Sequence, residues 1–342
     1  MKTDVRRRPT LIRMTTTVPA APLAHIAAQL THGGRGILAA DESIRTMSQR
    51  LEAQGIAASE TARRDYRELL LTAPGLAETV SGIILSDETF GQRLADGRPF
   101  PDAARELGAL PGIKVDTGTT PLPGQGGALV TEGLDGLGGR LADYAARGAA
   151  FAKWRAVFDV ATVNGYAARA NGHALARYAA LCQEHGIVPI VEPEVLCSGD
   201  HDLPASARAS ALALSALFDE LGQAGVDLTG IVLKPNFVTP GLGAAKAPAG
   251  EVAAATHQVL REHVPATVPG IAFLSGGHPT EDACAYLAAL KELSDRPWDV
   301  TFSFGRALVN SSLHTWAGDA DRVVAAQQQL LDNCAQAAAA AR

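Results

Sequence analysis

Val188-Pro-Ile-Val-Glu-Pro-Glu194 is a short apolar run that ends in two carboxylates, and it lies between two amphipathic stretches, Tyr166–Glu184 and Ser206–Ala224. The run lacks strict alternation of apolar and polar residues, which is typical of a parallel strand covered on both faces. Each flanking stretch is long enough for a helix. The sequence therefore predicts a helix–strand–helix unit whose strand is buried and parallel to its neighbours.

The same unit recurs along the chain. Short apolar or β-branched runs appear in eight places, and amphipathic stretches of helical length separate most of them. The runs are Gly36–Ala40, Gly82–Leu85, Gly112–Val115, Phe151–Trp154, Val188–Val191, Gly230–Leu233, Gly270–Leu274 and Val300–Phe304. Alternation of eight strands with helices predicts an α/β fold, the (β/α)8 TIM barrel. A doubly wound open sheet is the alternative, but no G-x-G-x-x-G motif follows a strand near the start of the chain.

Length and composition favour one large domain. The chain has 342 residues, 47% of them hydrophobic, and no segment has the composition of a linker that would divide it. We expect a single domain over residues 1–342, with a basic N-terminal arm over about 1–20 that carries Arg6, Arg7, Arg8 and Arg13. We also expect an Ala-rich helical C-terminal tail over about 318–342 whose end frays.

Charge and cysteine usage limit the class of protein. The formal net charge is −6, which argues against nucleic acid or an anionic membrane as the main partner. No apolar run reaches the length of about 18 residues that a membrane-spanning helix requires. The four cysteines show no CxxC spacing, which indicates free thiols in a reducing compartment and predicts a cytoplasmic location.

Polar and charged residues gather where the predicted strands end. In a strand, residues i and i+2 share a face, so several of these residues form same-face pairs. The residues are Asp41, Lys114, Asp116, Lys153, Arg155, Glu192, Glu194, Lys234, Ser275, Gly276, Ser303, Gly305 and Arg306. One such pair alone could be a solvated surface ion pair. Because the carboxyl ends of all barrel strands meet at one mouth, repetition at seven strands favours an active site there.

The residue types at this mouth suggest a chemistry. Lysines and arginines suit an anionic substrate, and phosphate is the common small anion. A lysine among other cations can be a neutral amine near neutral pH, and so a nucleophile toward a carbonyl group. Lys234 directly follows the strand Gly230–Leu233 and is the candidate nucleophile. Neighbouring carboxylates can then move the protons that formation and breakdown of a carbinolamine require.

Long segments of the chain, in order, resemble the class I fructose-bisphosphate aldolase family from about Ala28 to about Trp316. They are Gly36–Ser43, Asp96–Pro101, Gly112–Asp116, Glu132–Leu137, Phe151–Arg155, Gly186–Glu194, Gly199–Asp202, Leu233–Asn236, Phe273–Gly277 and Phe302–Leu308. The resemblance implies a (β/α)8 barrel and a lyase that reversibly cleaves fructose 1,6-bisphosphate to dihydroxyacetone phosphate and glyceraldehyde 3-phosphate in glycolysis and gluconeogenesis. It further implies a lysine Schiff base, no cofactor or metal, and a homotetramer.

By position, the resemblance also implies roles for individual residues. Lys234 corresponds to the Schiff-base lysine, Glu192 to the acid/base carboxylate, and Asp41 to the base that takes the C4 hydroxyl proton. Lys153, with Glu194 beside it, corresponds to the lysine that stabilises charged intermediates. The implied C1-phosphate residues are Ser275, Gly276, Gly277, Ser303, Gly305 and Arg306. The residues implied for the other phosphate are Ser43, Thr46, Arg50 and Lys114, and Arg155 is a further substrate contact.

The chain also departs from the family pattern. Thr46 stands where serine is common, Phe304 where tyrosine is common, and His278 where glutamine is frequent. Relatives of the animal type carry a functional tyrosine near the C-terminus, whereas this sequence has no tyrosine after Tyr286. We expect either that protonation of the enamine is slower here, or that water or a carboxylate such as Glu192 delivers the proton instead.

Two other functions remain as alternatives. A metal-dependent aldolase would need a ligand cluster, and His201 between Asp200 and Asp202 is the only tempting one. A binding scaffold could retain the barrel without catalysis, because fold alone does not imply function. A scaffold would not need the intact set Lys153, Glu192, Lys234 and Asp41.

Overall fold

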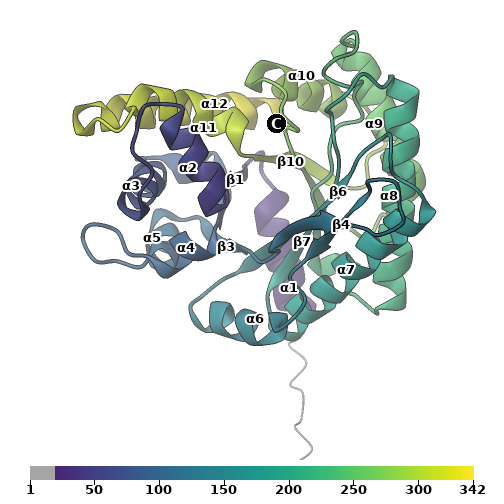
Figure 1. Cartoon of the computed structure of the whole chain (residues 1–342), viewed down its shortest axis with the longest axis horizontal. Coiled ribbons are helices and arrows are strands. Elements are labelled where there is room, and N and C mark those ends of the chain that lie inside the picture. Colours follow the sequence, from purple (N-terminus) through teal and green to yellow (C-terminus); the bar gives the residue numbers. More distant parts are fainter. Residues whose placement is uncertain (1–19) are drawn as a thin grey trace, which may run out of the picture.

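Eight parallel strands close into a barrel in the computed structural model, which describes residues 20–342 (Figure 1). The strands in their order around the barrel are β1 (Gly36–Ala40), β2 (Val80–Leu85), β3 (Leu110–Lys114), β6 (Phe151–Phe158), β7 (Val188–Val195), β8 (Val232–Leu233), β9 (Gly270–Phe273) and β10 (Asp299–Phe304). Each of the eight predicted runs overlaps one of these strands, although only Val232 and Leu233 of the run Gly230–Leu233 are in β8, so the (β/α)8 prediction is confirmed. The arginines of the expected N-terminal arm lie outside the described residues.

Helices surround the barrel. They are α1 (Ala20–Thr31), α2 (Ile44–Glu52), α3 (Glu60–Leu71), α4 (Asp87–Gly91), α5 (Phe100–Leu107), α6 (Leu137–Ala146), α7 (Gly165–Glu184), α8 (Leu203–Gln223), α9 (Ala249–His263), α10 (Thr280–Lys291), α11 (Arg306–Trp316) and α12 (Val323–Ala340). Several begin at a capping side chain, as at Asn164, which accepts hydrogen bonds from the backbone N–H groups of Tyr166 and Ala167. Among residues 20–342, no helix combines the length and apolar character needed to cross a membrane.

One end of the barrel is filled. Leu23, Ala27 and Leu30 of α1 are buried in one cluster with strand residues such as Phe151. The Phe151 ring occupies so much of the interior that a Cβ atom built at Gly112 would lie 2.2 Å from it. The close approach of this ring therefore requires glycine at position 112 on the neighbouring strand β3. Because α1 and this aromatic ring fill the amino-terminal end, the carboxyl ends of the strands are left to form a cavity.

An antiparallel hairpin that the sequence did not suggest follows β3. Its strands are β4 (Gly118–Pro121) and β5 (Leu129–Glu132), with the Gly/Pro-rich segment between them. Thr131 is buried, and its hydroxyl donates to the carbonyl of Arg155 on β6 at 2.8 Å. The hairpin is thereby attached to the barrel beside its mouth.

The expectation that the C-terminal tail frays is wrong. Residues 323–340 form α12, which packs against α11, α3 and α10. Ala326, Leu330 and Cys334 are spaced four apart and are fully buried, and Ala341 is also buried. Residues at this spacing share one helix face, and the small alanine side chains allow neighbouring helices to approach closely. A high alanine content here indicates a packed helix face.

Candidate active site

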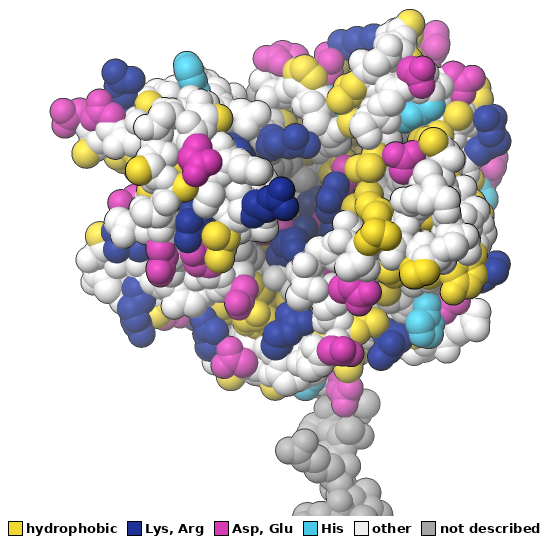
Figure 2. Space-filling view, in the orientation of Figure 1, with side chains coloured by type: hydrophobic (Ala, Val, Ile, Leu, Met, Phe, Trp, Pro, Cys, Tyr) yellow, Lys and Arg dark blue, Asp and Glu magenta, His cyan; other side chains and the backbone are white. Residues whose placement is uncertain are grey.

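A cavity of about 410 Å³ opens at the carboxyl ends of the strands. Figure 2 shows it as a hollow near the centre of the visible face, with lysine and arginine side chains inside and at its rim. Its lining is Ala39, Asp41, Glu42, Ser43, Thr46, Lys114, Asp116, Gly118, Thr119, Lys153, Arg155, Glu192, Glu194, Lys234, Leu274, Ser275, Gly276, Ser303, Gly305 and Arg306. Of the site residues expected from the sequence, the cavity brings together all except Arg50 and Gly277.

A chain of four buried charges lies at the bottom of this cavity. Glu192 on β7 bridges two lysines: its Oε1 lies 3.2 Å from Lys234 Nζ, and its Oε2 lies 3.2 Å from Lys153 Nζ. Lys153 on β6 also forms an ion pair with Asp41, which follows β1, at 2.7 Å. None of the four side chains is more than 11% exposed. Four strand ends thus place two amines and two carboxylates within reach of one substrate carbon chain.

These four buried charged groups determine one another's protonation states. Burial alone would raise the pKa of Asp41, but the positive charges of Lys153 and Lys234 outweigh burial and hold the pKa at about 2. Burial likewise opposes ionisation of Glu192, yet the same two lysines keep its pKa below the usual range. The pKa of Lys153 is raised because Asp41 and Glu192 outweigh its desolvation. Near neutral pH, Asp41 is therefore a carboxylate and Lys153 a cation.

Arg155 and Glu194 form a second pair on the wall of the cavity. Arg155 Nε donates to Glu194 Oε2, and the glutamate side chain is almost fully buried. Desolvation alone would lower the pKa of Arg155. The charge of Glu194 and its hydrogen bond outweigh desolvation and raise this pKa above its ordinary value. Glu194 thereby holds a permanent cation at the wall.

Two glycine-containing loops form a possible phosphate cradle at the ends of β9 and β10. The first is a turn closed by the hydrogen bond from His278 N to Ser275 O, 3.0 Å long. Its central residues Gly276 and Gly277 have φ angles of 60° and 93°, which favour glycine. Gly276 lines the main cavity, whereas Gly277 lines a neighbouring cavity of about 480 Å³.

The second loop of the cradle begins α11. Arg306 is the first residue of this helix and lines both cavities, and Gly305 is its N-cap. A helix N-terminus favours anions because its first N–H groups have no partner within the helix. Ser303 is 1% exposed, and its hydroxyl has no hydrogen-bond partner within the described part of the chain. These groups can together accept a phosphate.

A second group of donors lines the same cavity at the start of α2. Ser43 is the N-cap of this helix and accepts a hydrogen bond from Thr46 N at 3.2 Å. The hydroxyl groups of Ser43 and Thr46 lie 3.0 Å apart, and both residues line the cavity with Lys114. This side can take a second anion.

Arg50 lies outside this group. Its guanidinium pairs with Glu42 and donates to Asn310 Oδ1 on α11 at 2.9 Å. Arg50 therefore connects α2 to α11 in this structure. The partner that holds it there, Asn310, is distant in sequence, so sequence reasoning could not foresee it.

The sequence analysis also missed several lining residues. Glu42 directly follows Asp41, and this adjacency was an available signal. Asp116 was recognised only as sharing a strand face with Lys114. Gly118 and Thr119 enter the cavity because β4 folds over the mouth, for which the sequence gave no strong sign.

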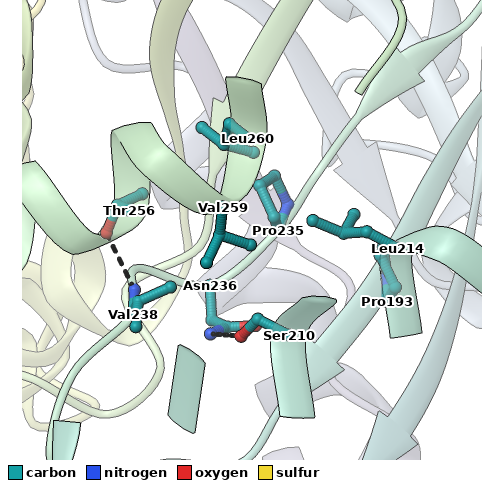
Figure 3. A pocket seen from close by; sticks show the side chains of 9 residues that line it. All are labelled: Pro193, Ser210, Leu214, Pro235, Asn236, Val238, Thr256, Val259 and Leu260. Atoms are coloured by element: carbon teal, nitrogen blue, oxygen red, sulfur yellow. Dashed lines mark hydrogen bonds between the residues drawn. The ribbon is translucent and has the colours of Figure 1, made fainter. Parts of the chain in front are cut away.

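A separate enclosed cavity of about 10 Å³ lies behind β7 and β8, against α8 and α9 (Figure 3). Its walls are mainly prolines and aliphatic side chains, with Asn236 donating to Ser210 Oγ at 3.4 Å and Thr256 accepting from Val238 N at 2.9 Å. A space of this size holds about one water molecule. It is too small for a sugar phosphate, so the cavity at the mouth is the candidate active site.

The residues around His201 have structural partners. Asp202 caps α8 by accepting a hydrogen bond from Ala205 N at 2.8 Å. The carbonyl of His201 accepts from Gly241 N at 2.9 Å. Within residues 20–342, no group of three or more His, Cys, Asp or Glu side chains has an arrangement suited to a metal ion.

Comparison with known proteins gives a consistent result. Residues 22–342 match the family model described as "Fructose-bisphosphate aldolase class-I". A probable fructose-bisphosphate aldolase class 1 from Xanthomonas campestris pv. campestris is 46% identical over 312 residues, which cover 90% of this chain and 93% of that protein. The cytosolic fructose-bisphosphate aldolase 6 of Arabidopsis thaliana is also 46% identical, with coverage of 90% and 87%.

A solved structure agrees in fold as well as in sequence. A fructose-bisphosphate aldolase from Plasmodium falciparum, crystallised with TRAP and a small-molecule inhibitor, superposes with a TM-score of 0.92 at 39% identity and covers 94% of both chains. The barrel, the charged mouth and these similarities lead to one conclusion: this chain belongs to the class I fructose-bisphosphate aldolase family.

Proposed function

We propose that this chain reversibly cleaves fructose 1,6-bisphosphate to dihydroxyacetone phosphate and glyceraldehyde 3-phosphate, with Lys234 as the amine that forms the Schiff base. The observation that carries the proposal is the buried chain Lys234–Glu192–Lys153–Asp41. It supplies an amine nucleophile, a carboxylate beside it, a cation and a second carboxylate, which are the groups that an aldol cleavage through an imine requires.

The first steps take place at C2 of the ketose. Glu192, whose Oε1 lies 3.2 Å from Lys234 Nζ, takes a proton from that nitrogen, and the free amine attacks the C2 carbonyl and forms a carbinolamine. Glu192 then gives this proton to the departing hydroxyl group, and loss of water leaves a protonated Schiff base. Lys153, which contacts the same carboxylate, supplies a fixed positive charge beside the oxygen as it leaves.

Carbon–carbon cleavage follows. Asp41, which is ionised near neutral pH, takes the proton of the C4 hydroxyl group. The C4–O bond becomes a carbonyl, the C3–C4 bond breaks, and its electron pair moves into the iminium to form an enamine. Glyceraldehyde 3-phosphate leaves first. The enamine gains a proton at C3, and hydrolysis then frees dihydroxyacetone phosphate and Lys234.

The two phosphates orient the sugar across the cavity. We assign the C1-phosphate to Ser275, Gly276, Ser303, Gly305 and Arg306, at the ends of β9 and β10, and the other phosphate to Ser43, Thr46 and Lys114, at the ends of β1 and β3, because both groups line the cavity that holds the buried charges. Arg155 is a further contact on the wall. Gly277 contributes through the turn that it forms with Gly276. Arg50 would reach the substrate only after leaving Glu42.

Trapping of the covalent intermediate tests the proposal. Borohydride with dihydroxyacetone phosphate should leave a reduced adduct on Lys234 that mass spectrometry locates. Lys234→Met should abolish the adduct and lower kcat/KM by at least about 10⁴-fold. Lys246→Met is the matched control, because Lys246 is exposed and pairs with Asp282 away from the buried charges. An adduct on Lys153 or Lys114, or activity that EDTA removes and zinc restores, would contradict the assignment.

The proposal also covers the location of the protein in the cell and its oligomeric state. We propose that the barrel and its surrounding helices act as a single aldolase domain, in the cytoplasm and as a homotetramer. Cytosolic relatives such as the Arabidopsis protein support the location. Cell fractionation checks the location, and sedimentation velocity distinguishes a tetramer from a monomer or dimer.

A further inference from the structure

Lys114, assigned above to the second phosphate, is held by a single neighbouring residue. Its Nζ donates to Asp116 Oδ1 at 2.6 Å and to the backbone carbonyl of the same aspartate at 2.7 Å. A lysine ammonium has three N–H donors. Asp116 therefore takes two of them and leaves one for a ligand in the cavity that both residues line.

Asp116 is itself fixed by the barrel. Its side chain is only 3% exposed. Oδ2 accepts from the backbone N–H of Arg155 on β6 at 3.2 Å, and Oδ1 also accepts from Gly118 N at the start of β4 at 3.3 Å. The carboxylate thus lies where β3 ends and is attached to the next strand and to the hairpin. It is a rigid anchor for a long and flexible side chain.

The charge of Asp116 matters as well as its hydrogen bonds. Lys114 belongs to a crowd of cations, since Lys153 and Arg155 line the same cavity. The negative charge of Asp116 contributes to raising the pKa of both of these neighbours. Without this carboxylate, the Lys114 ammonium would lose its hydrogen-bond acceptor and would be repelled by the other cations. It would therefore move toward solvent.

We propose that Asp116 is a positioning residue that sets the preference for a ketose with two phosphates over a ketose with one. It does so by fixing Lys114 where the phosphate distant from C1 binds. A long lysine side chain loses rotamer freedom when it is immobilised, and Asp116 imposes that loss before the substrate arrives. The inference rests on the proposed function, because it assumes that the second phosphate lies beside Ser43, Thr46 and Lys114.

Asp116→Asn tests the role, because asparagine keeps the size and one oxygen acceptor but removes the charge. The measurement is kcat/KM for fructose 1,6-bisphosphate divided by kcat/KM for fructose 1-phosphate. We expect this ratio to fall about 10-fold, mainly through KM for the bisphosphate, as for the loss of one charge-assisted contact. Activity on fructose 1-phosphate should stay within about 3-fold of wild type, because that substrate lacks the affected phosphate.

A double-mutant comparison connects the effect to Lys114. Lys114→Met should lower the ratio at least as far, and the variant carrying both substitutions should match Lys114→Met alone. Glu132→Gln, on the hairpin that Asp116 contacts, is the control for loss of a nearby carboxylate. Glu132 is exposed and contacts Thr120, so the ratio should not change.

Three outcomes would overturn the inference: an unchanged ratio in Asp116→Asn, an equal loss on both substrates, or a further fall in the ratio when Asp116→Asn is added to Lys114→Met. If Asp116→Asn fails to fold by circular dichroism, Asp116→Ser, which keeps a short acceptor, should show the same fall in the ratio. Dihydroxyacetone phosphate has no second phosphate, so its borohydride adduct on Lys234 should form normally in Asp116→Asn. Absence of that adduct in the wild type would instead refute the proposed function. The adduct therefore distinguishes failure of the proposed function from failure of the inference about Asp116.

Discussion

At the residue scale, the site depends on opposite charges that compensate for burial. Lys234 and Lys153 are each less than 5% exposed, which would be costly for isolated amines. Glu192 contacts both, and Asp41 contacts Lys153. Two carboxylates therefore balance two amines. The same compensation holds Asp41 ionised, so the arrangement that makes the site stable also supplies the base for cleavage.

Loss of the Arg306 side chain should weaken binding of the C1-phosphate. Its guanidinium lies at the start of α11 beside the turn that contains Gly276 and Gly277. A charge-assisted hydrogen bond contributes about 1.5–3 kcal/mol, so Arg306→Ala should weaken binding of a C1-phosphorylated ketose by roughly 10- to 150-fold. Kinetics with fructose 1-phosphate and with unphosphorylated fructose measure the difference. A similar loss on both substrates would indicate a folding defect.

At the element scale, a buried ion pair fixes the start of α2 against α3. Arg67 on α3 has a side chain that is only 2% exposed, and its Nη2 pairs with Glu42 Oε2 at 2.7 Å. Glu42 in turn holds Arg50, which donates to Asn310 on α11. The loop that follows β1, and carries Asp41 and Ser43, is thereby attached to two helices.

Removal of one partner of that pair should destabilise the protein. Arg67→Met would leave Glu42 with one cation instead of two, and we expect a loss of roughly 3 kcal/mol in the free energy of unfolding. Urea denaturation monitored by circular dichroism measures it. Arg64→Met is the matched control on the same helix, because Arg64 is one-third exposed and pairs with its exposed neighbour Asp65, so its effect should be within about 0.5 kcal/mol. Equal effects in the two variants would contradict the role of the buried pair.

At the scale of the whole molecule, the buried charges couple stability to pH. The folded-state pKa of Asp41 is about 2, below the ordinary value of 3.8. The ionised carboxylate therefore stabilises the folded protein above about pH 4, and this contribution is lost as the pH falls from about 4 toward 2. The shift corresponds to roughly 2 kcal/mol.

Comparison with Asp41→Asn tests this coupling. The variant lacks the carboxylate, so it should be less stable than wild type at pH 6, and the difference should shrink by roughly 2 kcal/mol as the pH falls from 4 to 2. Urea denaturation at a series of pH values measures the difference. A difference independent of pH would show that the ionisation of Asp41 is not coupled to folding.

Much of this molecule follows from local sequence. Eight apolar runs predicted eight strands, because burial on both faces leaves a recognisable pattern in a few consecutive residues. The ends of those runs predicted where Asp41, Lys153, Glu192 and Lys234 meet, because parallel strands in a barrel share one mouth. The assignment of roles came from the resemblance of long segments to a family, which periodicity alone could not provide.

The tertiary structure decided what depends on partners far apart in the chain. Arg50 lies against Asn310, Asp116 accepts from the backbone of Arg155, and α12 covers α3. The sequence alone placed Arg50 with the second phosphate and expected the alanine-rich end to fray. Both expectations were based on a segment alone, without the distant segments that pack against it in the folded protein. Side-chain pairing and helix docking depend on the surfaces that folding brings together. The strands and the positions where they end are determined by short runs of consecutive residues.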